Sequence, residues 1–268
     1  MSGVEKSVSE IAKEVALPFY TDAISPAAKE VGNGLTSIAR MVNAGIYLTE
    51  DCVTTLTAVL RLAGEQLCLL PPERIRLDRP RVSASVMEEA RCAINEPEIQ
   101  EMFANLLASS MDTERAKYAH PAYVGTIRQL DSDEAKILKY MQSHDGKVPT
   151  IKLIKSHGPV FGEDGTGIET TEIYENVNLV CEDSGCLYPD NEYTYFENLE
   201  RLGIISSVSG TSFVQGDWHQ RIYESPKVKQ LKGINPLLDK CRYEKTMYTL
   251  TGFGRGLMRA CLNVSEEN

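Results

Sequence analysis

The sequence lacks any apolar run long enough to cross a bilayer. Its longest uncharged stretches, 41–49 and 52–60, are separated by Glu50 and Asp51, and each is well short of the roughly 20 residues that a membrane-spanning helix needs. The N-terminus also lacks the basic region and apolar run of a signal peptide. Only two basic residues fall between positions 27 and 60, which argues against contact with an anionic membrane. We therefore expect a cytoplasmic protein.

Motifs that carry enzyme chemistry are missing as well. The chain has no GxSxG, HExxH or Walker sequence, and its seven cysteines are an odd number without paired spacing, which is typical of reduced thiols. Cys181 and Cys186 have CxxxxC spacing with no second pair, so zinc is not indicated. GFGRG at 252–256 resembles a phosphate loop, but Leu257 leaves GxGxxG incomplete. We assign no catalytic, cofactor-binding or metal-binding residues, expect no cofactor, and favour a non-enzymatic role.

Positive charge is scarce, with 28 lysines and arginines against 38 acidic residues. A chain of net charge −10 does not attract phosphate backbones as a whole, so contact with nucleic acid needs a local basic patch. Residues 221–259 hold nine basic and three acidic side chains, while 163–200 hold eleven acidic residues and no lysine or arginine. The basic segment could bind nucleic acid or pair with the acidic segment inside the fold. The acidic segment could also meet a basic partner.

The strongest pattern that is present runs from residue 96 to residue 123. Pro97 suits the first turn of a helix, where its missing N–H is not needed. A polar loop ends at His120-Pro121, and the residue before a proline does not easily continue a helix. The segment therefore predicts a buried core helix with a sharp exit. One broad face of that helix collects apolar residues at helical spacing, namely Ile99, Met102, Phe103, Leu106 and Leu107.

The same helix and three later blocks carry a resemblance to a known family. The blocks read EIQEMFANLLASSMD, AHPAYVGTIRQLDSDEAKIL, ENLERLGII and LTGFGRGLMRAC. Over about residues 27–262 they resemble the bacterial Abi-alpha family, formerly a domain of unknown function, which is associated with abortive infection against bacteriophage. The resemblance implies phage defence and implies no catalytic residues. The matching positions include Phe103, Asn105, Leu106, Ser109, His120, Pro121, Asp133, Asn198, Arg201, Gly203, Thr251, Gly254 and Cys261.

Helical patterns dominate, so we expect a mainly α fold. An N-terminal helix within 1–25 is followed by a helical domain over 26–128, one helix of which opens with a capping box at Ser85. Residues 129–268 are expected to form a winged-helix-like α+β domain with an acidic insertion near 150–190. At 268 residues the chain has room for one large domain or two smaller ones with ample core.

Residues 27–70 favour self-association. Long apolar faces with few charges are accompanied by small residues such as Gly32, Gly34 and Ala44, which would let two helices approach closely. A homo-oligomer is therefore expected. The same faces could instead pack against the helical pair at 82–112 within one chain, and this alternative stays open.

Four arginines follow Pro71-Pro72 within a few residues. They alternate in part with apolar residues, which predicts a short extended segment. Arginine clusters can bind phosphate bidentately, but these could also pair with nearby acidic residues, which we favour. The candidate interaction residues here are Arg74, Arg76, Arg79 and Arg81.

His120 is a further candidate interaction residue. A histidine before proline could act as a general base or metal ligand, which would make a hydrolase centred on it one alternative function. It has no second histidine or cysteine within ligand spacing, so we favour a ring that caps or fixes a helix end.

The C-terminal part shows several further elements. A regular helix is expected from Ser132, a second helix over about 170–185, and a third that Asn191 caps and Gly203 ends. A hairpin about Ser209-Gly210, a strand over TMYTLT and a final helix follow. This order is typical of a winged-helix domain with insertions.

The third of these helices would take the DNA-reading position, and its charges disfavour that role. Groove-facing helices need arginine, lysine and amide donors, whereas this one exposes three glutamates that would repel phosphate. We keep Glu197 and Arg201 as candidate interaction residues and favour a protein partner, for example a phage-encoded one. We expect an anti-phage sensing or protein-interaction module; a nucleic-acid-binding regulator is the alternative.

Overall fold

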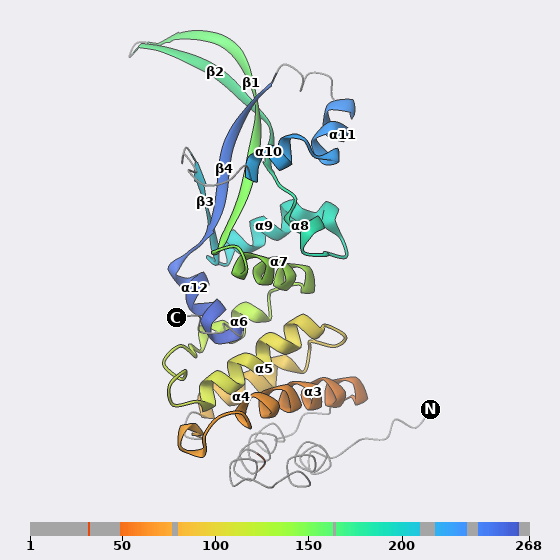
Figure 1. Ribbon diagram of the computed structural model, residues 1–268, viewed down its shortest axis with the longest axis vertical. Coiled ribbons are helices and arrows are strands. Elements are labelled where there is room, and N and C mark those ends of the chain that lie inside the picture. The colour runs from red at the N-terminus through yellow and green to blue at the C-terminus, as the bar shows by residue number, and fades with distance from the viewer. Residues whose placement is uncertain are drawn as a thin grey trace. The chain divides into compact units, whose positions relative to one another are not determined.

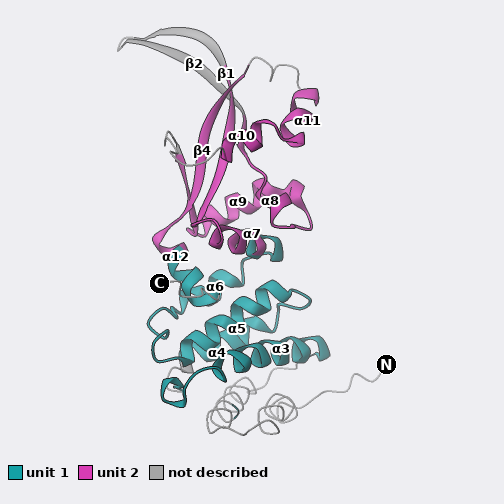
Figure 2. Cartoon of the chain, in the orientation of Figure 1, with its two compact units in different colours: residues 1–135, 255–268 teal, residues 136–254 magenta. Residues whose placement is uncertain are grey.

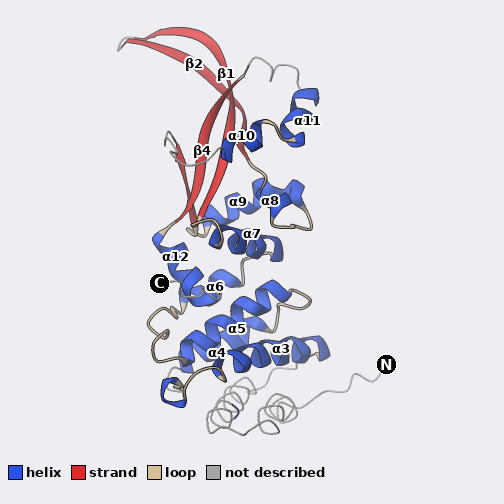
Figure 3. Ribbon diagram, viewed as in Figure 1, coloured by secondary structure: helices blue, strands red, loops and turns tan. Residues whose placement is uncertain are grey.

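The computed structural model describes residues 32, 49–76, 80–162, 165–209, 218–234 and 241–262 (Figure 1). The chain divides into two compact units, residues 1–135 with 255–268 (unit 1) and residues 136–254 (unit 2) (Figure 2). It is mainly helical, and its described strands form one small antiparallel sheet (Figure 3), which agrees with the expected mixture of helices and a minor sheet. The N-terminal helix expected within 1–25, Arg79 and most of 27–48 lie outside the described residues.

Helix α5 (Pro97–Met111) forms the core of unit 1, as the sequence predicts. Every residue from Met102 to Met111 is buried, and α5 packs against α3 and α4. Its start also agrees with the prediction, because Pro97 occupies the first turn. The other described elements of this unit are α3 (Glu50–Leu67), the 3-10 helix η1 (Pro72–Arg74), α4 (Pro80–Ala90) and α6 (Ala122–Ile127).

Polar side chains within α5 bind the last turn of α12 (Gly252–Cys261). Asn105 Nδ2 donates to the carbonyl of Cys261 at 2.9 Å, and Ser109 Oγ donates to the carbonyl of Ala260 at 2.8 Å. Asn105 also accepts a hydrogen bond from Gln66 of α3. Both side chains on α5 are fully buried, so these bonds satisfy groups that would otherwise be costly to desolvate.

Unit 2 is built on a four-stranded antiparallel sheet of order β2-β1-β4-β3. Its register places Lys147 opposite Thr249 and Ile205 opposite Leu250. The buried hydroxyls of Thr150 and Thr246 hydrogen-bond across the β1–β4 pair at 2.6 Å. The strands are β1 (Lys147–Gly162), β2 (Gly165–Val177), β3 (Ile205–Ser209) and β4 (Arg242–Leu250).

Short helices cover this sheet. On α9 the buried side chains are Tyr195, Phe196 and Leu199, and the ring of Phe196 lies 4.8 Å from that of Tyr248 on β4. Ile222 and Val228, from α10 and α11, join a cluster with Ile151, Leu153 and Val177 of the sheet. The helices are α7 (Ser132–Gln142), α8 (Val180–Asp183), the 3-10 helix η2 (Pro189–Asn191), α9 (Glu192–Arg201), α10 (Trp218–Tyr223) and α11 (Pro226–Ile234).

The helix expected over about 170–185 is wrong. Residues up to Val177 belong to β2, and only Val180–Asp183 is helical. The segment TTEIYENV is rich in β-branched and aromatic residues, which suit a pleated surface. Pairing with β1 then supplies the backbone hydrogen bonds.

Two smaller predictions also differ from the structure. Ser85 does not open a helix, because α4 already begins at Pro80. The segment with Arg74 begins as a 3-10 turn, and among its described residues Ile75 makes a strand-like bridge to Asp112. The expected hairpin partner of β3 lies outside the described residues, and β3 pairs with β4.

Candidate functional site

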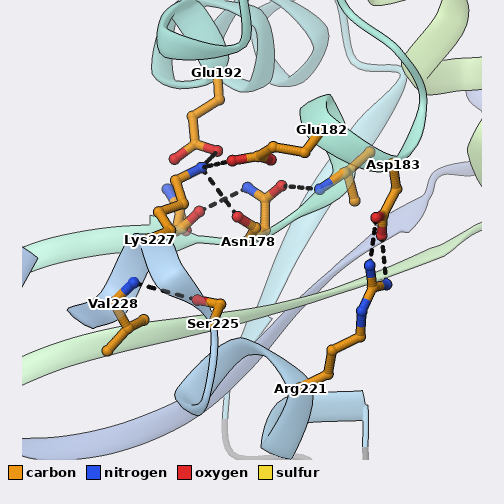
Figure 4. A network of polar contacts seen from close by, with 10 residues as sticks. Asn178, Glu182, Asp183, Glu192, Arg221, Ser225, Lys227 and Val228 are labelled. Atoms are coloured by element: carbon orange, nitrogen blue, oxygen red, sulfur yellow. Dashed lines mark hydrogen bonds and ion pairs between the residues drawn. The ribbon is translucent and has the colours of Figure 1, made fainter. Parts of the chain in front are cut away.

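Two basic side chains from α10 and α11 reach the acidic stretch between residues 178 and 192 (Figure 4). Arg221 donates from Nη1 and Nη2 to the two oxygens of Asp183 at 2.6 and 2.5 Å. Lys227 Nζ lies 3.1 Å from Glu182 Oε1, donates to the carbonyl of Asn178 at 3.0 Å and pairs with Glu192. We call this set of contacts the clasp, and it holds α10 and α11 against the 178–192 stretch.

Local sequence explains how the clasp is presented. Asn178 Oδ1 accepts the N–H of Val180 at 2.9 Å and so starts α8. Ser225 Oγ accepts the N–H of Val228 at 3.2 Å, and Pro226 opens α11, which places Lys227 in the first turn of that helix. The short helices α8 and α11 thus place side chains of opposite charge, Glu182 and Lys227, next to each other.

The surroundings favour the charged form of Lys227 but disfavour the charged form of Glu192. Burial alone would lower the pKa of Lys227, but Glu192 and Glu182 outweigh it and raise the pKa above its ordinary value. Burial raises the pKa of Glu192, and the nearby Lys227 only partly offsets that effect. Lys227 therefore stays an ammonium, with three acceptors around it. The contacts between side chains in the clasp are ion pairs, and none of them aligns a nucleophile with a base.

A pocket of about 220 Å³ lies beside the Arg221–Asp183 pair. The ring of His144 stacks on that of Tyr140 at 3.9 Å, and Trp218, the single tryptophan, is 39% exposed. Burial and then the Asp183 carboxylate, to which it hydrogen-bonds, raise the pKa of Tyr140. The pocket is lined by Tyr140, His144, Pro149, Leu179, Val180, Asp183, Trp218, Arg221 and Ile222.

The lining of this pocket favours binding over catalysis. Apolar and aromatic side chains supply most of it, and its carboxylate is already engaged by Arg221 and Tyr140. Such a site suits a small apolar or planar group, because few polar atoms need to lose a partner when it binds.

The outward face of α9 is the second feature of unit 2. Tyr193 is 56% exposed and hydrogen-bonds with Glu197. Arg201 donates to Asn198 Oδ1 at 2.6 Å, and Glu200 accepts the N–H of Ser207 at 3.3 Å. Glu197 and Arg201 thus lie on one exposed helix face, where acidic side chains outnumber the single arginine.

The arginines of the 74–81 segment do not have one shared environment. Arg74 binds Asp112 through Nε and Nη2 at 3.1 and 2.6 Å, and also Glu114 at 3.0 Å. Asp112 is almost fully buried, so this contact satisfies an internal charge. The backbone N–H of Arg76 donates to the carbonyl of Met111 at 2.8 Å, and Arg81 is exposed.

His120 makes a local contact at the start of α6. Its Nδ1 accepts the backbone N–H of Ala122 at 3.1 Å, and its ring lies edge-on to Tyr123 at 5.8 Å between centroids. This is the helix-fixing role favoured for the ring. Within the described part of the chain, no three His, Cys, Asp or Glu side chains gather as metal ligands would.

Gly254, the middle glycine of GFGRG, has a packing role. A Cβ on Gly254 would lie 2.1 Å from the carbonyl oxygen of Ile204, so only glycine lets α12 approach that backbone. Thr251 Oγ1 accepts the N–H of Gly254 at 2.9 Å and caps the helix.

None of the helices in the described ranges combines the length and apolar composition of a bilayer crossing.

Sequence reasoning anticipated that basic and acidic segments of unit 2 could pair, but it did not identify Lys227, Asp183 or the pocket. The useful signal was the change from an acidic stretch to a basic one in the same predicted domain. Tyr140, His144 and Trp218 gave no signal, because their spacing in the sequence has no motif.

Comparison with known proteins places most of the chain in a family. Residues 55–261 match the family model described as Abortive infection alpha. The match begins within α3 and ends at the last residue of α12. No curated protein and no solved structure matches the chain.

Proposed function

Because this chain belongs to the abortive infection alpha family, we propose that it serves bacterial defence against phage as a non-enzymatic sensing or protein-interaction module in the cytoplasm. Family membership supports the defence role. The observation that carries the interaction role is the exposed face of α9, with Tyr193 and Glu197 outward. An exposed tyrosine among carboxylates suits contact with a basic protein surface.

The topology of unit 2 supports a winged-helix-like domain. In a winged helix a strand between the first two helices pairs with the second strand of the hairpin that follows the third helix. Here β1 follows α7 and pairs with β4, and β4 pairs with β3, which follows α9. The order β1-β4-β3 has this connectivity, with α8 and α9 as the second and third helices and β2 as an addition beside β1.

The charges of this domain favour a protein over a nucleic acid. The helix in the reading position, α9, exposes Glu197 and Glu200 beside one arginine, and carboxylates repel a phosphate backbone. Arg221 and Lys227, from the basic segment, are engaged by acidic residues of unit 2. The cations that would make a nucleic-acid surface are therefore partly neutralised within the fold.

Charge reversal on α9 tests this proposal. We expect Glu197→Lys to lose both protection against phage and a protein captured from infected cells, while leaving thermal unfolding unchanged. Glu88→Lys is the matched control, since Glu88 is exposed on α4 of unit 1. Full protection and capture by Glu197→Lys would contradict an interface at α9.

The nucleic-acid alternative has its own test, because the helix order described above also suits DNA binding. With an acidic reading helix, duplex binding should be weak and unspecific at physiological salt. Sequence-specific binding tighter than about 10⁻⁸ M, as dedicated binders reach, would favour the regulator instead.

Self-association through residues 27–70 is also part of the proposal. It rests on the apolar spacing of this segment in the sequence, most of which precedes the first described helix. Sedimentation of the whole chain tests it, since a 29.7 kDa species at micromolar concentration would be a monomer.

A further inference from the structure

The C-terminal end of α8 folds into a Schellman motif that begins and ends with cysteine. The N–H of Cys186 donates to the carbonyl of Cys181 at 2.9 Å, and the N–H of Gly185 donates to that of Glu182 at 3.3 Å. Gly185 has φ +71°, the left-handed conformation that this motif requires. In a Schellman motif the side chains of the two end positions meet, and here those positions are Cys181 and Cys186.

The two thiols are in contact and differ in exposure. They hydrogen-bond with each other, and both are free cysteines. Cys181 is fully buried and Cys186 is half-buried. Ser184 Oγ lies 3.4 Å from Cys186 Sγ, where a hydroxyl can donate to a thiolate. A disulfide needs close Cα atoms and converging Cβ directions; the backbone bond between Cys186 and Cys181 and the thiol contact meet both needs.

We propose that Cys181 and Cys186 are a redox modification site, at which the two thiols form a reversible disulfide that closes the end of α8. The inference goes beyond the proposed function and stands without it, because it rests on the backbone geometry and the thiol contact alone. Disulfides in reducing compartments are mostly transient and regulatory, which is the behaviour expected of this pair.

The reaction with a peroxide balances in two steps. The Cys186 thiolate attacks one peroxide oxygen, the O–O bond breaks, and the leaving oxygen takes up a proton, which leaves Cys186 as a sulfenic acid. The Cys181 sulfur then attacks the Cys186 sulfur, the S–O bond breaks, and water leaves with the proton of Cys181. Two electrons pass from the thiols to the peroxide, and a dithiol reverses the change. Cys186 reacts first because it is the more exposed, while burial raises the pKa of Cys181.

Closure of the disulfide acts on the clasp. The bridged segment contains Glu182 and Asp183, which hold Lys227 and Arg221. Drawing Cys186 toward Cys181 shifts this segment, and Asp183 also lines the pocket with Trp218. As the single tryptophan, Trp218 reports on that shift by its fluorescence.

Hydrogen peroxide and the whole purified chain test the site. After peroxide and alkylation of remaining thiols, mass spectrometry should find residues 181 and 186 joined and two hydrogens lost, and dithiothreitol should restore both thiols and the tryptophan emission. Cys186→Ser should abolish the bridge, and Cys181→Ser should stop at a Cys186 sulfenic acid that dimedone traps. Cys92→Ser is the control for an exposed thiol and should bridge as the wild type does.

The opposite results are equally clear. If both thiols can still be alkylated in denaturant after the wild type has met peroxide that oxidises Cys92, the proposal is wrong. This result does not depend on whether any variant folds. A bridge between other cysteines, or one lost in Cys92→Ser, would also overturn it. A 181–186 bridge with unchanged emission would show that it does not reach the pocket and would overturn that part of the inference.

Discussion

The core helix of unit 1 and the α10–α11 segment of unit 2 hold their polar groups in different ways. In unit 1 an apolar helix, α5, forms the core, and its buried Asn105 and Ser109 bind backbone carbonyls. In unit 2 the α10–α11 segment is attached by a small apolar cluster and by paired charges from Arg221 and Lys227. Neutral contacts to backbone are insensitive to pH and salt, whereas exposed ion pairs are sensitive to both. The α10–α11 segment is thus expected to respond to pH and salt more than α5 does.

The largest effect is expected in the core of unit 1. Leu106 is fully buried and Leu69 is 85% exposed. Leu106→Ala should cost about 2–5 kcal/mol through lost burial and the cavity left behind, while Leu69→Ala, the matched control, should stay within about 0.5 kcal/mol. Urea unfolding measures both. Equal costs would show that α5 does not carry the core.

The clasp should give a smaller and more local effect. Lys227→Met leaves Glu182 and Glu192 without their cation, and because these side chains are partly exposed we expect about 1–3 kcal/mol, less than the roughly 3–5 for a fully buried pair. Hydrogen exchange should quicken in α11 and stay slow in α5. The control is Lys229→Met, whose lysine is exposed on the same helix. Faster exchange in both units would remove the contrast between them.

Alkaline pH should diminish the advantage of Lys227. Its pKa is raised above the ordinary 10.5 in the folded protein, so its contribution is fully present below 10.5 and is lost as pH rises through the raised value. The stability difference between wild type and Lys227→Met should therefore be constant near neutrality and shrink above that pH. Unfolding followed by Trp218 fluorescence measures it; a difference that grows with pH would contradict the pairing.

Loss of the Arg221 contact should have the smallest effect. The Arg221 side chain is 64% exposed, and pairs of this kind contribute about 0–1 kcal/mol. Arg221→Gln should therefore unfold almost as the wild type does, yet shift the emission of Trp218, which lines the same pocket. Gln220→Ala is an exposed control on α10. Destabilisation well above 1 kcal/mol would mean that unit 2 depends on this pair for its fold.

Much of the helical part could be predicted from the sequence because helix signals are local. Pro97 and the apolar spacing after it gave α5, and Gly203, with φ +69°, ends α9 as expected. β2 was missed because a helix was expected over about 170–185, and its pairing with β1 shows the strand.

The candidate site could be predicted only in outline. Lys227 and Glu192 are 35 positions apart, and Asn105 is 156 positions from its acceptor. Such contacts depend on which distant segments the fold brings together, and the periodicity of apolar residues carries no information about these pairings. The pocket likewise draws Tyr140 and Trp218 from elements with no shared pattern.

The hydrogen bonds from Asn105 and Ser109 also set an order of events during synthesis. Their acceptors, the carbonyls of residues 261 and 260, leave the ribosome only after the whole of unit 2 has been translated. The strands of unit 2 are complete once Leu250 has emerged, whereas α5 must wait with its polar groups unsatisfied. Unit 1 therefore begins to form first and is completed last, and a released chain that ends before residue 260 keeps all four strands but lacks the acceptors of Asn105 and Ser109.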